Sequence, residues 1–340
     1  MLRPYKFKHH KIHKAQSFVN YIVLEILCKA RSFTQPNFSS ALVLPKYRSL
    51  IDDVNVEYIL NPLTEAYAIC RTLSRKDLNV LKSAVLQNNR IRELCNGEIK
   101  PVLYADIEKI NARLSEQIKV FCDKLYDESI NKAAFYRQFE TIDAYYKQLV
   151  GRSSICRLCG INKVLTKFHK HRSALDHFLP RKYFPFASIN FKNLVPICDT
   201  CNSKYKLGEN PILKILNKGT TREQVRRVKA FYPFRTESPD IQISITFNKT
   251  FSSNIEPEDI EIELSCAGND EQIESWDRLF GIKENYLAAC CTDEMYNFYE
   301  EQYIADMNYG KSHDEYIDSL NSNKFADMNF LKIPFLEAMR

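Results

Sequence analysis

Glycine, proline and cysteine are all scarce in this chain, and each scarcity excludes a class of protein. The 340 residues include 8 glycines and 13 prolines, which rules out collagen-like and low-complexity sequence. The 11 cysteines are too few for a small scaffold held together by disulfides. The apolar stretch 18–28 contains Asn20 and Glu25, is too short to cross a bilayer, and lacks a small-residue cleavage site. We therefore expect a cytoplasmic globular protein of two or three domains, with reduced thiols and no membrane association.

Charge is distributed unevenly along the chain. The net charge is +6, from 48 Lys and Arg against 42 Asp and Glu. Residues 1–150 contain 23 basic and 16 acidic side chains, residues 151–235 contain 18 and 4, and residues 236–340 contain 7 and 22. The basic central segment is typical of a surface that binds a polyanion, because Lys and Arg near phosphates release condensed counterions. A solvated basic face has the same composition, so charge alone does not assign a function. The acidic segment could repel DNA, bind a basic partner or cover a site.

Helical patterns dominate residues 1–150. Residues 1–14 carry five positive charges, three histidines and no acid, which favours a flexible basic arm. Ser74 and the pair Asn96-Gly97 are typical of the two ends of a helix. Apolar residues at three- and four-residue steps predict further helices over 15–29, 103–125 and 132–149. None of them carries a catalytic motif, so we expect a scaffold or partner-binding domain.

The fold class that these patterns predict is α+β, in three parts. Residues 1–150 form the helical domain, residues 151–235 a cysteine-rich module, and residues 236–340 an acidic α+β region. In the last of these, residues 241–247 and 260–264 alternate apolar and polar side chains, which predicts a pair of strands. The acidic remainder is expected to be mostly helical.

Two Cys-x-x-Cys pairs in the central segment predict a structural zinc site. Cys156 and Cys159 form one pair, Cys198 and Cys201 the other, and 38 residues separate them. Each pair lies in a tight turn sequence that lets two thiolates face one ion at about 2.3 Å. Four thiolates leave no open coordination position, so this zinc would stabilise the fold. Unrelated core cysteines or a redox pair are the alternatives.

Polar residues follow a recognisable order in the segment that lies between the two cysteine pairs and extends just past the second pair. This segment contains Asp176-His177-Phe-Leu-Pro180, then Asn193-Leu194, then Asn202 directly after Cys201. In this order it resembles the HNH endonucleases of the ββα-metal fold, in the subset braced by two zinc knuckles. The resemblance covers residues 151–235. It departs from the family at the basic residue that ends the motif, for which Lys204 and Lys206 are alternative equivalents.

The resemblance implies a metal-dependent nuclease that hydrolyses phosphodiester bonds in DNA. His177 would be the general base, since the near-neutral pKa of histidine suits that role. Asp176 and Asn202 would offer hard oxygen ligands to a catalytic Mg²⁺ or Mn²⁺, which stabilises the developing negative charge. Asn193 would fix the loop that orients the base.

Several basic side chains of this segment are candidates for phosphate contact. They are Arg181, Lys182, Lys204 and Lys206. His169 and His171 match no family position, so an exposed basic loop is the preferred interpretation for them. Each of these residues could also be merely solvated.

Two short tracts outside the motif resemble, more loosely, bacterial HNH proteins of anti-phage defence loci. They are residues 231–235, Phe-Tyr-Pro-Phe-Arg, and residues 276–282, Trp-Asp-Arg-Leu-Phe-Gly-Ile. The likeness implies a partner such as a separate ATPase or sensor, because this chain has no phosphate-cradling Gly-x-x-x-x-Gly-Lys motif. An oligomer is also compatible with the sequence.

Two other functions remain open at this level. A zinc-stabilised protein that binds nucleic acid or a partner without catalysis would keep the same cysteines. An RNA-directed nuclease would use the same chemistry, because phosphoryl transfer does not itself distinguish the two sugars.

Overall fold

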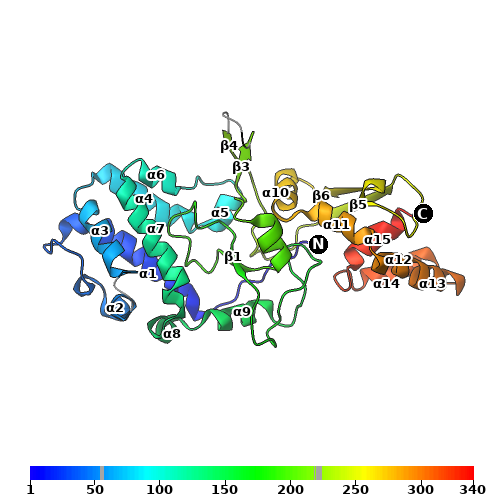
Figure 1. The fold of residues 1–340 in the computed structure, drawn as a ribbon, viewed down its shortest axis with the longest axis horizontal. Coiled ribbons are helices and arrows are strands. Elements are labelled where there is room, and N and C mark those ends of the chain that lie inside the picture. The colour runs from blue at the N-terminus through cyan, green and yellow to red at the C-terminus, as the bar shows by residue number, and fades with distance from the viewer. Residues whose placement is uncertain (54–56, 218, 220–223) are drawn as a thin grey trace.

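Helices make up one end of the molecule, small antiparallel sheets occupy its middle, and a mixed region forms the other end (Figure 1). This arrangement comes from a computed structural model that describes residues 1–53, 57–217, 219 and 224–340. The expected α+β class agrees with the observed mixture of helices and small antiparallel sheets.

The helical end is built from residues 11–150. Its α-helices are α1 (Ala15–Tyr21), α2 (Pro45–Asp52), α3 (Leu60–Cys70), α4 (Arg75–Asn88), α5 (Ile91–Cys95), α6 (Tyr104–Glu108), α7 (Ala112–Asp127), α8 (Ala133–Phe139) and α9 (Ile142–Val150). The π-helical η2 (Ile22–Leu27) continues α1, and single 3₁₀ turns occur at η1 (Lys11–Lys14), η3 (Ala30–Ser32), η4 (Ser40–Leu42) and η5 (Ser129–Asn131).

The predicted helices are present, but some of them are divided by residues that change the chain direction. Ser74 begins α4 as expected, because its Oγ accepts a hydrogen bond from the Asp77 amide at 3.2 Å. The helix predicted between Ser74 and Asn96 is divided, since α4 ends at Asn88 and α5 begins at Ile91. The predicted helix 103–125 breaks before α7, where the Asn111 side chain accepts from the Leu114 amide at 2.8 Å. The helix over 132–149 breaks at Glu140, whose φ is +69°.

The expectation of a flexible N-terminal arm is wrong. Met1, Leu2 and Tyr5 are at most 5% exposed. The Tyr5 hydroxyl donates to the carbonyl of Pro196 at 2.9 Å, and the Tyr5 amide donates to the carbonyl of Pro233 at 2.8 Å. The first residues therefore belong to the central part of the molecule, away from the helix α1 that follows them (Figure 1).

The central part contains two hairpins and one short helix. Strands β1 (Leu175–His177) and β2 (Leu194–Pro196) pair antiparallel, with Asp176 opposite Val195 and His177 opposite Leu194. The π-helical η6 (Thr200–Lys206) follows β2. A second hairpin, β3 (Leu213–Leu216) with β4 (Gln224–Arg227), was not predicted and projects from the body of the molecule (Figure 1).

The predicted pair of C-terminal strands is confirmed as β5 (Gln242–Phe247) and β6 (Ile260–Ser265). The 3₁₀ turn η7 (Pro257–Asp259) precedes β6. The helices that follow are α10 (Asp270–Phe280), α11 (Ile282–Cys290), α12 (Asp293–Asn297), the π-helical η8 (Phe298–Tyr303), α13 (Ile304–Asn308), α14 (His313–Asn321) and α15 (Asn329–Glu337).

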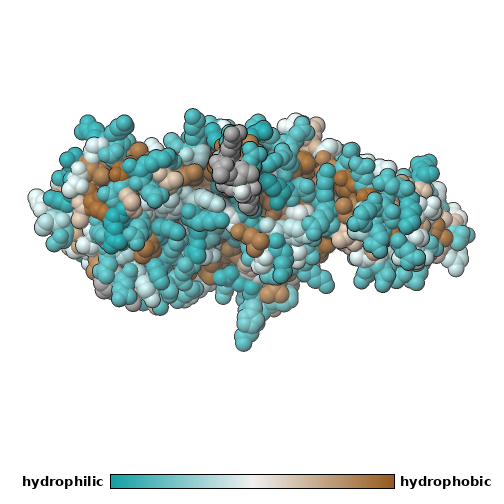
Figure 2. Space-filling model, turned by 45° about the horizontal axis from the view of Figure 1, so that its top comes forward, coloured by the Kyte–Doolittle hydropathy of each residue, from teal (hydrophilic) through white to brown (hydrophobic). Residues whose placement is uncertain are grey.

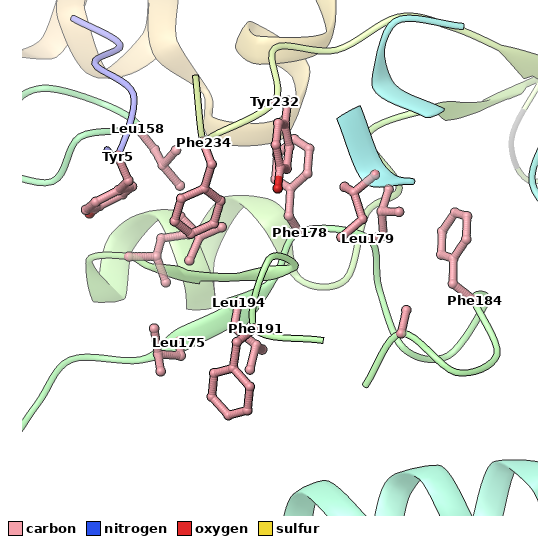
Figure 3. Close-up of a cluster of buried hydrophobic side chains, with 14 of the residues drawn as sticks. Tyr5, Leu158, Leu175, Phe178, Leu179, Phe184, Phe191, Leu194, Tyr232 and Phe234 are labelled. Atoms are coloured by element: carbon pink, nitrogen blue, oxygen red, sulfur yellow. The ribbon is translucent and has the colours of Figure 1, made fainter. Parts of the chain in front are cut away.

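Buried apolar side chains form one continuous core through all three parts. In its centre, the Tyr5 ring from the N-terminal segment packs against Phe234, which packs in turn against Tyr232 (Figure 3). The aromatic residues of 231–235 are thus core residues. On the outside, one face is mainly hydrophilic, with apolar residues in small scattered areas (Figure 2). No helix among the described residues has both the length and the hydrophobicity of a membrane span.

Candidate metal centre and active site

The four paired cysteines meet at one buried point. The Sγ atoms of Cys156, Cys159, Cys198 and Cys201 all lie within 4.8 Å of one another. The pair Cys159 and Cys198 is 4.0 Å apart, far beyond the ~2.05 Å of a disulfide bond. Tetrahedral zinc thiolates at about 2.3 Å from the ion place sulfur atoms roughly 3.8 Å apart. The donor set and its spacing therefore fit a structural zinc ion.

Neighbouring elements hold the first cysteine turn from three directions. The carbonyl of Cys159 accepts from the Tyr286 hydroxyl at 2.9 Å and from the amino group of Met1 at 3.2 Å. The carbonyl of Leu158 accepts from the Trp276 indole at 2.7 Å. Gly160, with φ +81°, makes room for Met1, since a Cβ there would overlap the Met1 backbone. The C-terminal helices α10 and α11 are thus part of the surroundings of the metal site.

Asp176 and His177 lie together on β1, next to η6. The Lys206 ammonium at the end of η6 is 2.8 Å from Asp176 Oδ2 and donates to the His177 carbonyl at 2.9 Å. Oδ2 is buried and accepts no hydrogen bond from the described residues, because the Lys206 contact lies outside hydrogen-bond geometry. The predicted first strand of the site and the predicted following helix are therefore in direct contact.

One ring nitrogen of His177 is fixed by the backbone. Its Nε2 donates to the carbonyl of Ser188 at 2.7 Å, so the neutral ring carries its proton there and leaves Nδ1 as an acceptor. The Tyr126 ring packs edge-on against the imidazole, with centroids 4.4 Å apart. Burial lowers the pKa of His177 to about 4, against the smaller opposing effect of the Ser188 carbonyl. The side chain is therefore neutral at pH 7, as a general base must be, but its pKa lies well below the near-neutral value expected from the sequence.

Asn193 ties together the loop between β1 and β2. It is fully buried, and its Oδ1 accepts from the Leu179 amide at 2.8 Å. Its Nδ2 donates to the carbonyl of Leu179 at 2.9 Å and to that of Ala187 at 3.3 Å. Ala187 precedes Ser188, so these bonds set the position of the carbonyl that holds His177.

Asp176 and Asn202 are the two oxygen donors that were predicted to hold a divalent cation. Asp176 offers a carboxylate whose side chain is 15% exposed, and its Oδ2 forms an ion pair with the Lys206 ammonium at 2.8 Å. The side chain of Asn202, on η6, has no hydrogen-bond partner among the described residues and is half-buried. Mg²⁺ commonly takes one or two protein oxygens and completes its shell with water and phosphate. The Asn202 side chain is thus free to act as a ligand, whereas Asp176 would bind such an ion in competition with Lys206.

The four predicted phosphate contacts occupy different environments. Lys182 and Lys204 are exposed, and Lys204 has no partner within the described ranges. Arg181 is engaged, because it lies 2.7 Å from Asp127 and 3.7 Å from Asp123. Lys206 differs most from the expectation, since its side chain is 1% exposed and cannot act as a surface contact in this conformation.

His169 and His171 lie on the exposed loop that was expected for them. His169 Nδ1 is occupied, because it accepts from the Thr166 amide at 3.0 Å. Neither histidine belongs to the cysteine cluster, which is the one group of potential metal ligands found among the described residues.

Sequence reasoning did not find two contacts of His177. Ser188 acts through its backbone carbonyl, which every residue has, so no residue type could signal it. Tyr126 lies on α7, far away in sequence, and only the packing of α7 against the central part brings it to the imidazole.

Comparisons with protein-family models, with curated proteins and with solved structures give no match. The interpretation of the site therefore depends on its own residues and geometry.

Proposed function

We propose that this chain is a metal-dependent endonuclease of the HNH type that hydrolyses phosphodiester bonds in DNA. The observation that carries the proposal is the state of His177, a neutral imidazole with Nε2 bound to the Ser188 carbonyl and Nδ1 left as an acceptor. It lies next to Asp176, on a hairpin that leads into a short helix beside four clustered cysteines.

Each residue has a distinct role in this proposal. His177 Nδ1 accepts a proton from the attacking water, while the Ser188 carbonyl keeps the ring in the tautomer that can do so. Asn193 positions that carbonyl through the bonds to Leu179 and Ala187. Asp176 and Asn202 would hold Mg²⁺ or Mn²⁺, which supplies Lewis-acid stabilisation of negative charge on the phosphate. A zinc ion on the four cysteines would hold the ends of the segment together.

Charge favours nucleic acid as the substrate. Residues 151–235 contain 18 basic and 4 acidic side chains, and Lys182 and Lys204 expose theirs to solvent. Phosphate contacts of this kind would make binding weaken steeply with salt. DNA is the proposed substrate by resemblance to the HNH family, and RNA is the alternative to test beside it.

A role in anti-phage defence, together with a separate ATPase or sensor protein, is the wider setting that we propose. It is motivated by the tracts 231–235 and 276–282. Copurification from the native host would identify such a partner.

The proposal is tested by incubating supercoiled plasmid with the zinc-loaded protein and Mg²⁺ or Mn²⁺. We expect wild type to cut and His177→Ala to remain folded and zinc-loaded while losing at least about 100-fold in rate. His171→Ala, on the exposed loop, is the matched control and should cut normally. Equal cutting by wild type and His177→Ala would refute the assignment.

One observation supports a second candidate, a zinc-stabilised protein that binds nucleic acid without cutting it. Lys206 already contacts the carboxylate that a catalytic ion would need. Salt-sensitive binding of DNA without product, with every divalent metal and with the copurified partner, would favour this candidate.

A further inference from the structure

Lys206 is a buried cation placed against a proposed metal ligand. Its side chain is 1% exposed, and its Nζ lies 2.8 Å from Asp176 Oδ2. A hydrogen bond of 2.9 Å to the His177 carbonyl fixes the ammonium on the β1 side of η6. A buried charge is tolerated only with such partners, so Asp176 and the His177 carbonyl are what keep Lys206 in the interior.

The charges around Asp176 balance without a metal ion. Asp176 contributes one negative charge and Lys206 one positive charge, while Asn202 and the imidazole of His177 add no negative charge. Arg181 is compensated separately by Asp127 and Asp123, at 2.7 Å and 3.7 Å. The proposed cation site is therefore neutral as a unit, whereas a divalent ion binds best where carboxylates outnumber cations.

A divalent ion at Asp176 would lie within a few ångströms of the Lys206 ammonium. At that separation the repulsion between the two cations is large, because the site is shielded from bulk water. A phosphate of the nucleic-acid backbone would bring the missing negative charge and would also serve as a ligand.

We propose that Lys206 acts as a built-in counter-ion that keeps the catalytic cation site neutral, so that a divalent metal binds stably only together with the substrate phosphate. This inference rests on the proposed function and extends it to regulation of the same site. Metal and nucleic acid then bind with positive coupling, and each raises the affinity for the other.

The test measures metal affinity directly. Mn²⁺ binding to the full-length, zinc-loaded protein is followed by electron paramagnetic resonance, with and without duplex DNA. The His177→Ala background is used throughout to prevent cleavage. Lys206→Gln keeps a hydrogen-bond donor near Asp176 and the His177 carbonyl but removes the charge. Lys283→Gln, which removes an exposed charge on α11, is the matched control.

Without DNA, we expect Lys206→Gln to bind Mn²⁺ about tenfold more tightly than its parent, and Lys283→Gln to have the same Mn²⁺ affinity as the parent. DNA should tighten Mn²⁺ binding strongly in the parent and much less in Lys206→Gln. Unchanged or weaker Mn²⁺ binding in Lys206→Gln would overturn the inference, and so would an Mn²⁺ affinity of the parent that DNA does not change.

Two further measurements separate the possible failures. Zinc content and circular dichroism report whether Lys206→Gln folds. If this variant does not fold, the effect of DNA on Mn²⁺ binding by the parent still decides whether metal and nucleic acid bind with positive coupling. If plasmid cleavage needs Mn²⁺ and His177 but Lys206→Gln leaves the Mn²⁺ affinity unchanged, only the counter-ion role of Lys206 is wrong. If wild type neither cuts nor binds Mn²⁺, the proposed function is wrong as well.

Discussion

Gly281 lies against the aromatic ring of Tyr205, with no space between them for a side chain. A Cβ on Gly281 would overlap the ring of Tyr205. Gly281 ends α10, and Tyr205 belongs to η6, the helix that carries Asn202 and Lys206. The acidic C-terminal region is therefore packed onto the proposed catalytic helix. Ion pairs add to this contact, since Glu274 pairs with Lys214 and Glu271 lies 3.2 Å from Arg226 on the projecting hairpin.

Replacement of Gly281 by Ala should destabilise the protein by about 1–3 kcal/mol, because the methyl group meets Tyr205 and the φ of +55° disfavours any L side chain. Urea unfolding measures this free energy. Gly268→Ala is the control, since Gly268 also has a positive φ, +71°, but no atom within 4 Å of the added Cβ. A loss in Gly281→Ala no larger than that of Gly268→Ala would contradict the packing argument.

Loss of one zinc ligand should unfold the centre of the molecule. Cys201→Ser weakens a thiolate site whose metal binding is coupled to folding, so we expect bound zinc to disappear and the cooperative unfolding transition to be lost or strongly lowered. Elemental analysis and thermal unfolding check both effects. Cys70→Ser removes a buried thiol on α3, outside the cluster, and should keep its zinc. Full zinc retention in Cys201→Ser would show that the cluster is not the metal site.

Acid should weaken the docking of the N-terminal segment through His13. Burial lowers the pKa of His13, with a weaker opposing effect from the Lys8 carbonyl and a further lowering by Lys192 and its neighbouring histidines. His13 therefore binds a proton more readily in the unfolded state than in the folded state. The stability that neutral His13 contributes is complete above about pH 6.5 and is lost as the pH falls through the lowered pKa.

His13→Gln tests this acid sensitivity. Comparison of urea unfolding at pH 7 and pH 5 should show a smaller loss of stability in His13→Gln than in wild type. His9→Gln, at an exposed neighbouring position, should lose as much stability between pH 7 and pH 5 as wild type does. If the stability of wild type and of His13→Gln changed equally with pH, protonation of His13 would not be the cause of the acid sensitivity.

Removing the indole hydrogen bond of Trp276 should loosen the first cysteine turn. Trp276→Phe leaves the buried Leu158 carbonyl without its 2.7 Å donor, for which we expect a loss of about 1–3 kcal/mol and faster release of zinc to a chelator. Tyr309→Phe, at a side chain that is 91% exposed, should change neither quantity. If zinc release from Trp276→Phe matched wild type, α10 would not support the metal site.

Local patterns predicted several of the elements. Ser74 was found as a cap because the N-cap side chain acts on an amide three residues away, and β5 and β6 were found because alternation of side chains is a local property. The exact helix ends were missed at Asn111 and Glu140, where a single residue changes the chain direction within a continuous apolar pattern.

Long-range packing was not predictable from the same patterns. The charges of residues 1–14 suggested a free arm, but Met1, Leu2 and Tyr5 are apolar enough to be buried, and only the fold provides the surface that accepts them. The same holds for Lys206, which any pattern of basic residues would place in solvent. Its burial depends on Asp176, which lies 30 positions earlier in the sequence.

The two cysteine pairs make residues 156–201 a closed loop once a metal joins them. Lys167 and Lys170 lie on an exposed stretch inside that loop, where a protease can reach the backbone. A single cut there would leave the two chain fragments joined through the thiolates, so the nicked protein would migrate as one particle in its native state. Chelation would remove the metal link but leave the apolar core that both fragments share. Native gels of the nicked protein with and without chelator would therefore show how far the association of the fragments depends on the ion.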